Sequence, residues 1–116
     1  MATLQHTPDQ AVVRLSRDLG FSMATLAQAT GTSPRTVERW RSGETLPQHA
    51  ARRRLAALLA LERRLRETFD SPEAIRAWLK AENRYFGGLT PADAVQVGRF
   101  DRVEAALEAL DSGVFV

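Results

Sequence analysis

Apolar residues recur along this chain at the spacing of an α-helix. Between residues 8 and 19, Ala11, Val12, Leu15 and Leu19 follow one another at intervals that place them on one helix face. No stretch of four or more residues alternates between apolar and polar side chains, as a half-buried strand does. The pattern predicts an all-α fold of about seven helices. They are expected over about 8–19, 23–29, 34–42 and 49–68, from 72 through Leu79, from 91 to Gly98, and over 99–111.

A hydroxyl residue followed by proline marks the start of several of these helices. Thr7-Pro8 opens the first, and Gln10 completes the pattern in which two side chains satisfy the free amides of a helix start. The same signal recurs at Ser33-Pro34, Ser71-Pro72 and Thr90-Pro91. Loops are expected over 44–47 and 83–89. The longer helix over 49–68, which lacks glycine and proline, is expected to join two halves of the chain.

The composition excludes several classes of protein. The chain has 116 residues, 44 % of them hydrophobic, which suits one small domain or two very small ones that share a core. No apolar run reaches the roughly 18 residues of a membrane span, and we identify no signal peptide. Because there is no cysteine and only His6 and His49 supply imidazole, a multi-ligand metal centre is not expected. We expect a cytoplasmic protein with no metal, no cofactor and no membrane partner.

The net charge of +2 conceals a difference between the two halves. Up to residue 69 there are 11 arginines and 6 acidic residues, a net charge of +5. From residue 70 onward there are 5 basic and 8 acidic residues, a net charge of −3. A basic half favours nucleic acid as its partner, and opposite signs suggest two tasks. Scattered, solvated surface charge is an equally good explanation of an excess of this size.

Residues 21–47 carry the most informative pattern of the basic half. A helix of about seven residues, a turn that contains Gly31, and a second helix from Pro34 match the helix-turn-helix plan. In that plan the second helix enters the major groove of DNA. Val37 and Trp40 are spaced to pack against the first helix, so Arg35 and its neighbours are expected to point outward.

These outward positions carry the chemistry that DNA recognition needs. An arginine offers a bidentate fork to guanine, and a small hydroxyl at a helix start leaves backbone amides free for phosphate. The predicted DNA-binding residues are Ser33, Arg35, Thr36, Arg39, Arg41 and Arg52. Within Arg52-Arg53-Arg54, consecutive side chains point about 100° apart, so at most two of the three face one duplex. Glu38 would repel phosphate, and a helical hairpin without a nucleic-acid role remains the alternative.

The same region carries a resemblance to a known family. The matching residues are Leu26-Ala27, Gly31-Thr32-Ser33, Arg35-Thr36-Val37, Arg39-Trp40-Arg41-Ser42-Gly43 and Pro47. They resemble the Xre-type, or phage-repressor-like, helix-turn-helix family over about 30 residues. The resemblance implies this fold and, less strongly, DNA binding.

A second pattern lies in the acidic half. Its elements are Trp78-Leu79, the run Asn83-x-x-Phe86-Gly87-Gly88-Leu89-Thr90-Pro91, and then Gly98, Val103, Leu107 and Gly113. They resemble the toxin-binding domain of the Xre/MbcA/ParS antitoxin family over roughly 45 residues. The ending Gly113-Val114-Phe115-Val116 resembles the mycobacterial MbcA branch.

This resemblance implies an antitoxin of a type II toxin–antitoxin system that holds a RES-domain toxin. Such toxins degrade NAD by hydrolysis or phosphorolysis, so the NAD chemistry belongs to the partner and this chain is expected to be no enzyme. We also expect it to repress its own operon, which requires a homodimer or a toxin–antitoxin hetero-oligomer to cover paired half-sites of operator DNA. The predicted toxin-binding residues are Trp78, Asn83, Arg84, Tyr85, Phe86, Gly113, Val114, Phe115 and Val116.

The last residues suggest how inhibition works. Val114, Phe115 and Val116 form an apolar tip with a terminal anion, which fits a pocket built for a nicotinamide nucleotide. In the alternative, Phe115 packs on the chain's own core. Arg84 and Tyr85 either contact the partner or pin the loop around them.

The sequence thus predicts two modules, an Xre-like helix-turn-helix DNA-binding domain over 1–69 and a toxin-binding domain over 70–116. One alternative is a stand-alone Xre-family transcriptional repressor with a C-terminal dimerisation domain. Another is an interaction protein whose helix-turn-helix has lost DNA binding. A small enzyme is the most distant alternative, because no phosphate cradle, metal spacing or nucleophile arrangement is present.

Overall fold

The computed structural model describes residues 6–113, and all regular structure in that range is helical. The elements are α1 (Pro8–Leu19), α2 (Met23–Thr30), α3 (Pro34–Arg41), α4 (His49–Thr68), α5 (Pro72–Lys80), the 3-10 helix η1 (Arg84–Phe86), α6 (Pro91–Gln96) and α7 (Phe100–Asp111). The predicted all-α fold is confirmed. The expectation of an irregular loop over 83–89 is wrong in one respect, because η1 lies within it.

Side-chain caps are present at two of the predicted helix starts, and the cap of α6 is reciprocal. At α6, the Asp93 amide donates to Thr90 Oγ1 at 3.1 Å and the Thr90 amide donates to Asp93 Oδ2 at 3.0 Å. At α1, the Thr7 amide donates to Gln10 Oε1 at 3.2 Å. Each bond satisfies an amide at a helix start. These short polar motifs therefore fix where the helices begin.

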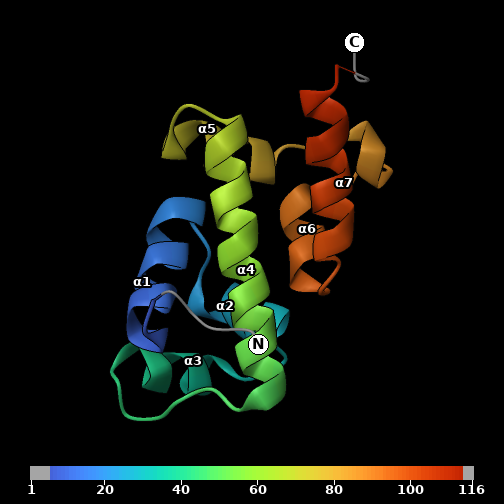
Figure 1. Ribbon diagram of the computed structural model, residues 1–116. Coiled ribbons are helices and arrows are strands. Elements are labelled where there is room, and N and C mark those ends of the chain that lie inside the picture. Colours follow the sequence, from blue (N-terminus) through green and yellow to red (C-terminus); the bar gives the residue numbers. More distant parts are fainter. Residues whose placement is uncertain (1–5, 114–116) are drawn as a thin grey trace.

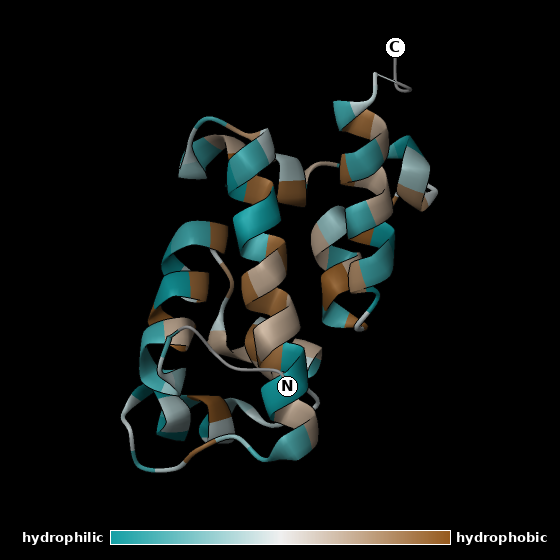
Figure 2. Cartoon of the chain, in the orientation of Figure 1, coloured by the Kyte–Doolittle hydropathy of each residue, from teal (hydrophilic) through white to brown (hydrophobic). Residues whose placement is uncertain are grey.

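The long helix α4 forms the centre of the molecule (Figure 1). Helices α1 and α2 pack against one side of it and α7 packs against another, while α5 contacts α1, α4 and α6. The buried residues of α4 include Leu55, Leu58, Leu61 and Leu65. Its hydrophobic residues concentrate in the middle turns (Figure 2). One helix therefore supplies apolar surface to both halves of the chain.

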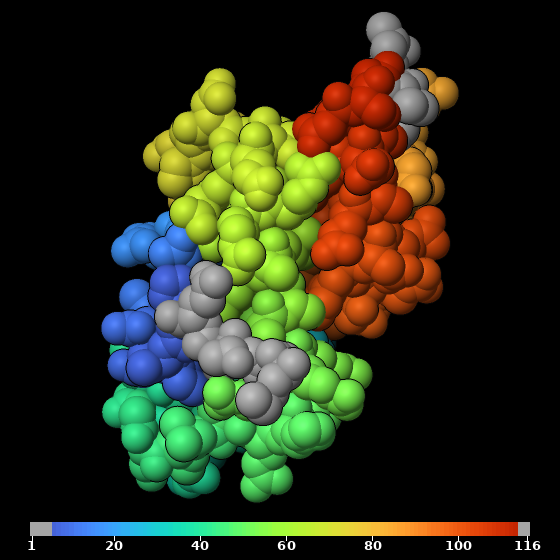
Figure 3. Space-filling model, in the orientation of Figure 1, coloured from blue at the N-terminus to red at the C-terminus, as the bar shows by residue number. Residues whose placement is uncertain are grey.

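The two halves share one hydrophobic core. Buried side chains from before and after residue 70 form a single cluster, and α2 and α6 touch across the division. In Figure 3 the surfaces of α4 and α7 lie in continuous contact. The predicted boundary at 69/70 directly follows Phe69, the residue that caps the end of α4. The shared core does not separate two modules at that point. The division therefore remains a prediction that the two halves have different functions.

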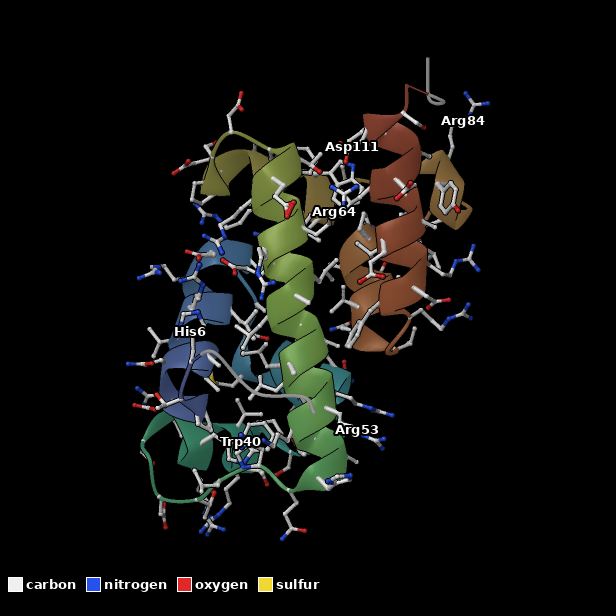
Figure 4. All side chains as sticks on the ribbon, in the orientation of Figure 1. His6, Trp40, Arg53, Arg64, Arg84 and Asp111 are labelled. Carbon is white, nitrogen blue, oxygen red and sulfur yellow. The ribbon has the colours of Figure 1, made fainter. Side chains whose placement is uncertain are left out.

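Polar contacts fasten the two halves at two further places. Arg76 on α5 donates from Nη1 to the backbone oxygen of Arg17 at 3.0 Å, close to the left-handed Gly20 that ends α1. A Cβ at position 20 would lie 2.8 Å from Arg76 Cδ, so this close approach requires glycine. Near the far ends of α4 and α7, Arg64 and Asp111 form an ion pair (Figure 4).

Two properties of the described residues bear on function. No helix among them is both long and apolar enough to cross a membrane. Within 6–113, no group of three or more His, Asp or Glu side chains is arranged to hold a metal ion.

Candidate functional site

The helix-turn-helix predicted over 21–47 is formed by α2 and α3. Val37 is fully buried and Trp40 is 2 % exposed, and α3 packs against both α1 and α2. Figure 4 shows the Trp40 ring turned inward from α3. The prediction that these two residues face inward is confirmed. Their burial turns the opposite face of α3 outward, with Arg35 exposed and Arg39 half-buried.

The hydroxyls at the start of α3 are already occupied. Ser33 Oγ accepts the Thr36 amide at 3.2 Å and lies 3.0 Å from Thr36 Oγ1. The expectation that a small hydroxyl leaves this amide free for a phosphate is therefore wrong for Thr36, because Ser33 caps it. Pro34, the first helical residue, carries no amide hydrogen. The groups that α3 could offer to a ligand are consequently mainly its arginines.

Acidic residues lie beside two of the three α3 arginines. Arg41 Nε donates to Glu38 Oε1 at 2.9 Å, and this hydrogen bond lowers the pKa of the Glu38 carboxyl. Arg39 Nε lies 4.0 Å from Glu44 Oε2. Across residues 6–113, Arg35 has no acidic partner within ion-pair distance. Arg35 is thus the α3 side chain most available to a ligand.

The arginines at the start of α4 point in different directions. Arg52 is half-buried, while Arg53 and Arg54 are exposed. The Arg54 guanidinium crosses to the turn between α2 and α3, where a Cβ on Gly31 would lie 2.9 Å from Arg54 Nη1. Arg53 projects away from α4 (Figure 4). Arg54 therefore lies beside the helix-turn-helix, whereas the sequence predicts a DNA contact for Arg52.

The residues predicted to contact a toxin separate into two groups. Asn83 holds its own loop, because its Oδ1 accepts the Tyr85 amide at 2.9 Å and its amide donates to the Leu89 oxygen at 3.1 Å. Phe86 is only 7 % exposed. Half-buried Trp78 packs against Phe69, with ring centroids 5.5 Å apart. The structure thus uses these three side chains largely for folding.

The remaining predicted toxin contacts are accessible as far as the structure describes them. Arg84 and Tyr85 on η1 and Gly113 after α7 are exposed. Figure 4 shows Arg84 projecting outward near the end of the molecule where α7 ends. Val114, Phe115 and Val116 lie outside the described residues, so both expectations for this tail remain predictions.

The structure reveals a groove in the acidic half that the sequence analysis missed. It encloses about 430 Å³ and lies between the segment that follows η1, helix α6 and the first turn of α7. Its lining residues are Phe86, Leu89, Thr90, Asp93, Ala94, Gln96, Val97, Arg99 and Arg102. Leu89 and Val97 are 60 % and 75 % exposed. The one feature of the sequence that indicates this groove is Val97, an apolar residue directly before Gly98 that does not belong to the apolar face of a helix.

Two carboxyl groups meet between α1 and α4. Glu62 Oε1 accepts from Arg14 Nε at 3.1 Å, and Arg66 Nε lies 3.1 Å from Oε2, although the Glu62 side chain is only 1 % exposed. Burial raises the pKa of the Glu62 carboxyl, and its contact with Asp18 raises it further. Burial also acts to raise the pKa of Asp18, but hydrogen bonds with Glu62 and Arg17 outweigh it and lower that pKa. This cluster ties α1 to α4.

These features define a helical protein with a helix-turn-helix at one end and an accessible, partly apolar groove in its other half. Residues 64–113 match the family described as "Antitoxin Xre/MbcA/ParS C-terminal toxin-binding domain". The mycobacterial cidal antitoxin MbcA, from both Mycobacterium bovis and Mycobacterium tuberculosis, is 34 % identical over 98 residues, covering 84 % of this chain and 86 % of MbcA. The chain belongs to the Xre/MbcA/ParS antitoxin family.

Two further relatives extend the likeness. The Mycobacterium tuberculosis protein named "Probable mycobacterial cidal antitoxin Rv3188" is 30 % identical over 105 residues, covering 90 % of this chain and 89 % of that protein. A chain in the crystal structure of the M. tuberculosis MbcT–MbcA toxin–antitoxin complex superimposes with a TM-score of 0.72 at 30 % identity. The match covers 96 % of this chain and 99 % of that one. The likeness therefore includes the helix-turn-helix as well as the acidic half.

Proposed function

We propose that this chain is the antitoxin of a type II system and neutralises a RES-domain, NAD-degrading toxin by direct binding. The observation that carries the proposal is the match to a toxin-binding domain over residues 64–113. That domain presents an accessible apolar groove together with exposed Arg84 and Tyr85. The similarity of nearly the whole chain to one in the MbcT–MbcA complex supports the same assignment. NAD breakdown is then the toxin's reaction, and this chain performs no catalysis.

The C-terminal segment is the part of the antitoxin that we place near the toxin's active site. Its accessible start is Gly113, two residues after the end of α7, and apolar residues 114–116 follow in the sequence. An apolar segment of this size suits a pocket that otherwise accepts a nicotinamide ring. Inhibition then follows from exclusion of NAD and needs no change in the toxin's fold.

The test begins with the protein encoded by the reading frame beside this chain's gene. The two proteins are purified together, and NAD consumption by the partner is measured with and without the antitoxin. We expect NAD loss by the partner alone and its suppression in the complex. A partner that forms no complex, or that consumes no NAD, contradicts the proposal. Deletion of 114–116 is expected to relieve inhibition, and full inhibition by the shortened antitoxin removes the tail from the mechanism.

We further propose that the helix-turn-helix represses the antitoxin's own operon. The inward packing of Val37 and Trp40 turns Arg35 outward on α3, where a recognition helix presents its base contacts. One such helix covers one half-site, so repression requires two copies of the chain, joined directly or through the toxin. Fluorescence anisotropy with the chain's own promoter at two salt concentrations tests this role. Equal affinity for promoter and random duplex DNA contradicts it.

A further inference from the structure

The groove beside α6 combines exposed apolar side chains with a buried floor. Phe86 and Ala94 are 7 % and 8 % exposed, and Leu89 and Val97 stand above them at 60 % and 75 %. Exposed apolar side chains that gather around a hollow mark sites of protein association more often than isolated ones do. The groove is therefore shaped to receive an apolar side chain.

The charges along the groove are not balanced. Arg99 donates two hydrogen bonds to the Asp101 carboxylate, each at 3.1 Å, and Asp93 is engaged with Thr90 in the cap of α6. Arg102 is exposed and has no ion-pair partner anywhere in the described range 6–113. An acidic group on a docked partner would be the first to pair with this guanidinium. The groove thus favours a carboxylate next to the apolar side chain that it receives.

The position of the groove limits what occupies it. All of its lining residues fall within 64–113, the range that matches a toxin-binding domain. Arg102 lies in the first turn of α7, and Asp111, the last residue of that helix, lies roughly 14 Å further along its axis at 1.5 Å per residue. Gly113 comes two residues after Asp111. The groove is therefore separate from the segment that we place near the toxin's active site.

We propose that this groove is a second, anchoring contact for the toxin, which inserts an apolar side chain flanked by a carboxylate. The inference rests on the proposed function, because the toxin is the occupant. Leu89 and Val97 supply the apolar contact and Arg102 supplies the ionic one. The groove sets how tightly the toxin is held, while the segment after α7 sets whether NAD enters. Affinity and inhibition are thus assigned to different ends of one helix.

The experiment measures toxin affinity and inhibition separately. The toxin encoded beside this gene is titrated with full-length antitoxin, and Kd is obtained by calorimetry alongside NAD consumption at saturating antitoxin. The variants are Val97→Asp and Arg102→Glu. Their matched controls are Leu46→Asp, which alters a 68 % exposed leucine in the other half, and Lys80→Glu, which alters an exposed cation at the end of α5. Circular dichroism checks that every variant keeps its helical content.

We expect Val97→Asp and Arg102→Glu to weaken binding at least tenfold, with full inhibition restored at saturating antitoxin. The two controls are expected to leave Kd within about twofold. If the unaltered antitoxin binds the toxin and neither groove variant changes Kd, the anchor is refuted while the proposed function stands. If Val97→Asp leaves Kd for the toxin unchanged but lowers the mass of the free antitoxin in light scattering, the groove joins copies of this chain. That outcome overturns the proposal. Failure of the unaltered antitoxin to bind overturns both proposals.

Discussion

The outer face of α3 and the groove beside α6 are built in opposite ways. On α3 the apolar residues Val37 and Trp40 are buried, and two of three arginines already have acidic neighbours. In the groove, Val97 is largely exposed and Arg102 has no acidic partner in the described chain. A charged surface binds a partner through electrostatic attraction, which salt weakens. An exposed apolar groove binds a partner by burying apolar surface, which salt affects much less. Salt is therefore expected to weaken binding at α3 far more than binding at the groove.

The comparison of the α3 face with the groove depends first on whether the two halves of the chain unfold as one cooperative unit. Leu61 is fully buried in α4, so Leu61→Ala is expected to lower the free energy of unfolding by about 2–5 kcal/mol. Because Trp40 and Trp78 are the chain's two tryptophans, Trp40→Phe and Trp78→Phe backgrounds report on one half each in urea denaturation. We expect Leu61→Ala to shift both transitions together. A shift in only one half would show that the halves unfold independently.

The next largest effect concerns Arg35, the α3 arginine that has no acidic partner among residues 6–113. Arg35→Ala is expected to cost about 1–3 kcal/mol in binding to the chain's own promoter and to relax sequence preference if Arg35 reads a base. If it contacts phosphate instead, affinity falls equally for all sequences and the salt dependence becomes shallower. Fluorescence anisotropy at two salt concentrations distinguishes these outcomes. Arg84→Ala, which removes an exposed arginine from the other half, is the control. Equal losses for both variants would contradict the assignment of DNA binding to α3.

A smaller effect is expected from the acidic residues of the same face. The double change Glu38→Gln and Glu44→Gln frees Arg41 and Arg39 from their neighbours. Each freed arginine that reaches a phosphate makes the slope of log affinity against log salt steeper by about 0.9. We therefore expect severalfold tighter binding to random duplex DNA at low salt, measured by anisotropy. Unchanged affinity would mean that these acids do not restrain the surface. The double change Glu67→Gln and Glu104→Gln, which removes two exposed carboxylates from α4 and α7, controls for net charge.

The smallest expected effect is a pH dependence of the free energy of unfolding. It matters for the comparison because both surfaces belong to the same folded unit. Burial raises the pKa of Glu62 in the folded state, so the folded chain holds this proton more tightly than the unfolded chain does. Its contribution is present below the unfolded pKa and is lost as pH rises through the raised one. Urea midpoints should therefore show Glu62→Gln gaining stability relative to the unaltered chain as the pH rises above 4.5, the ordinary pKa of a glutamate. Arg14, Arg66 and Asp18 surround this carboxyl. A difference independent of pH would contradict the raised pKa.

Local sequence was sufficient to predict most of the fold. Hydroxyl–proline pairs and helical spacing located the helices, because capping and amphipathic burial act within a few residues. The inward faces of Val37 and Trp40 followed from the same reasoning. The 3-10 helix η1 was missed because it depends on Asn83 bonding to the Tyr85 amide within a loop that otherwise reads as glycine-rich.

The candidate site was harder to predict, because it depends on contacts between distant residues. Arg54 reaches the α2–α3 turn only once α4 packs there, and the groove forms only where the segment after η1 meets α6 and α7. The family resemblance implied that Asn83 and Phe86 contact a partner, but the hydrogen bonds of Asn83 and the burial of Phe86 show that both help to hold the fold. Val97 was overlooked, since one apolar residue outside a stripe carries no periodic signal.

The central position of α4 also limits how proteins of this design can be recombined. A crossover in the loop before α4 would join α1 and α2 to a foreign helix, and one at residue 69 would do the same to α7. At either junction, α4 loses its original partners on one side, either α1 and α2 or α7. Exchange of halves between relatives is therefore expected to yield poorly folded chimeras. Whatever the α3 face and the groove each recognise, the two specificities should be inherited as one block.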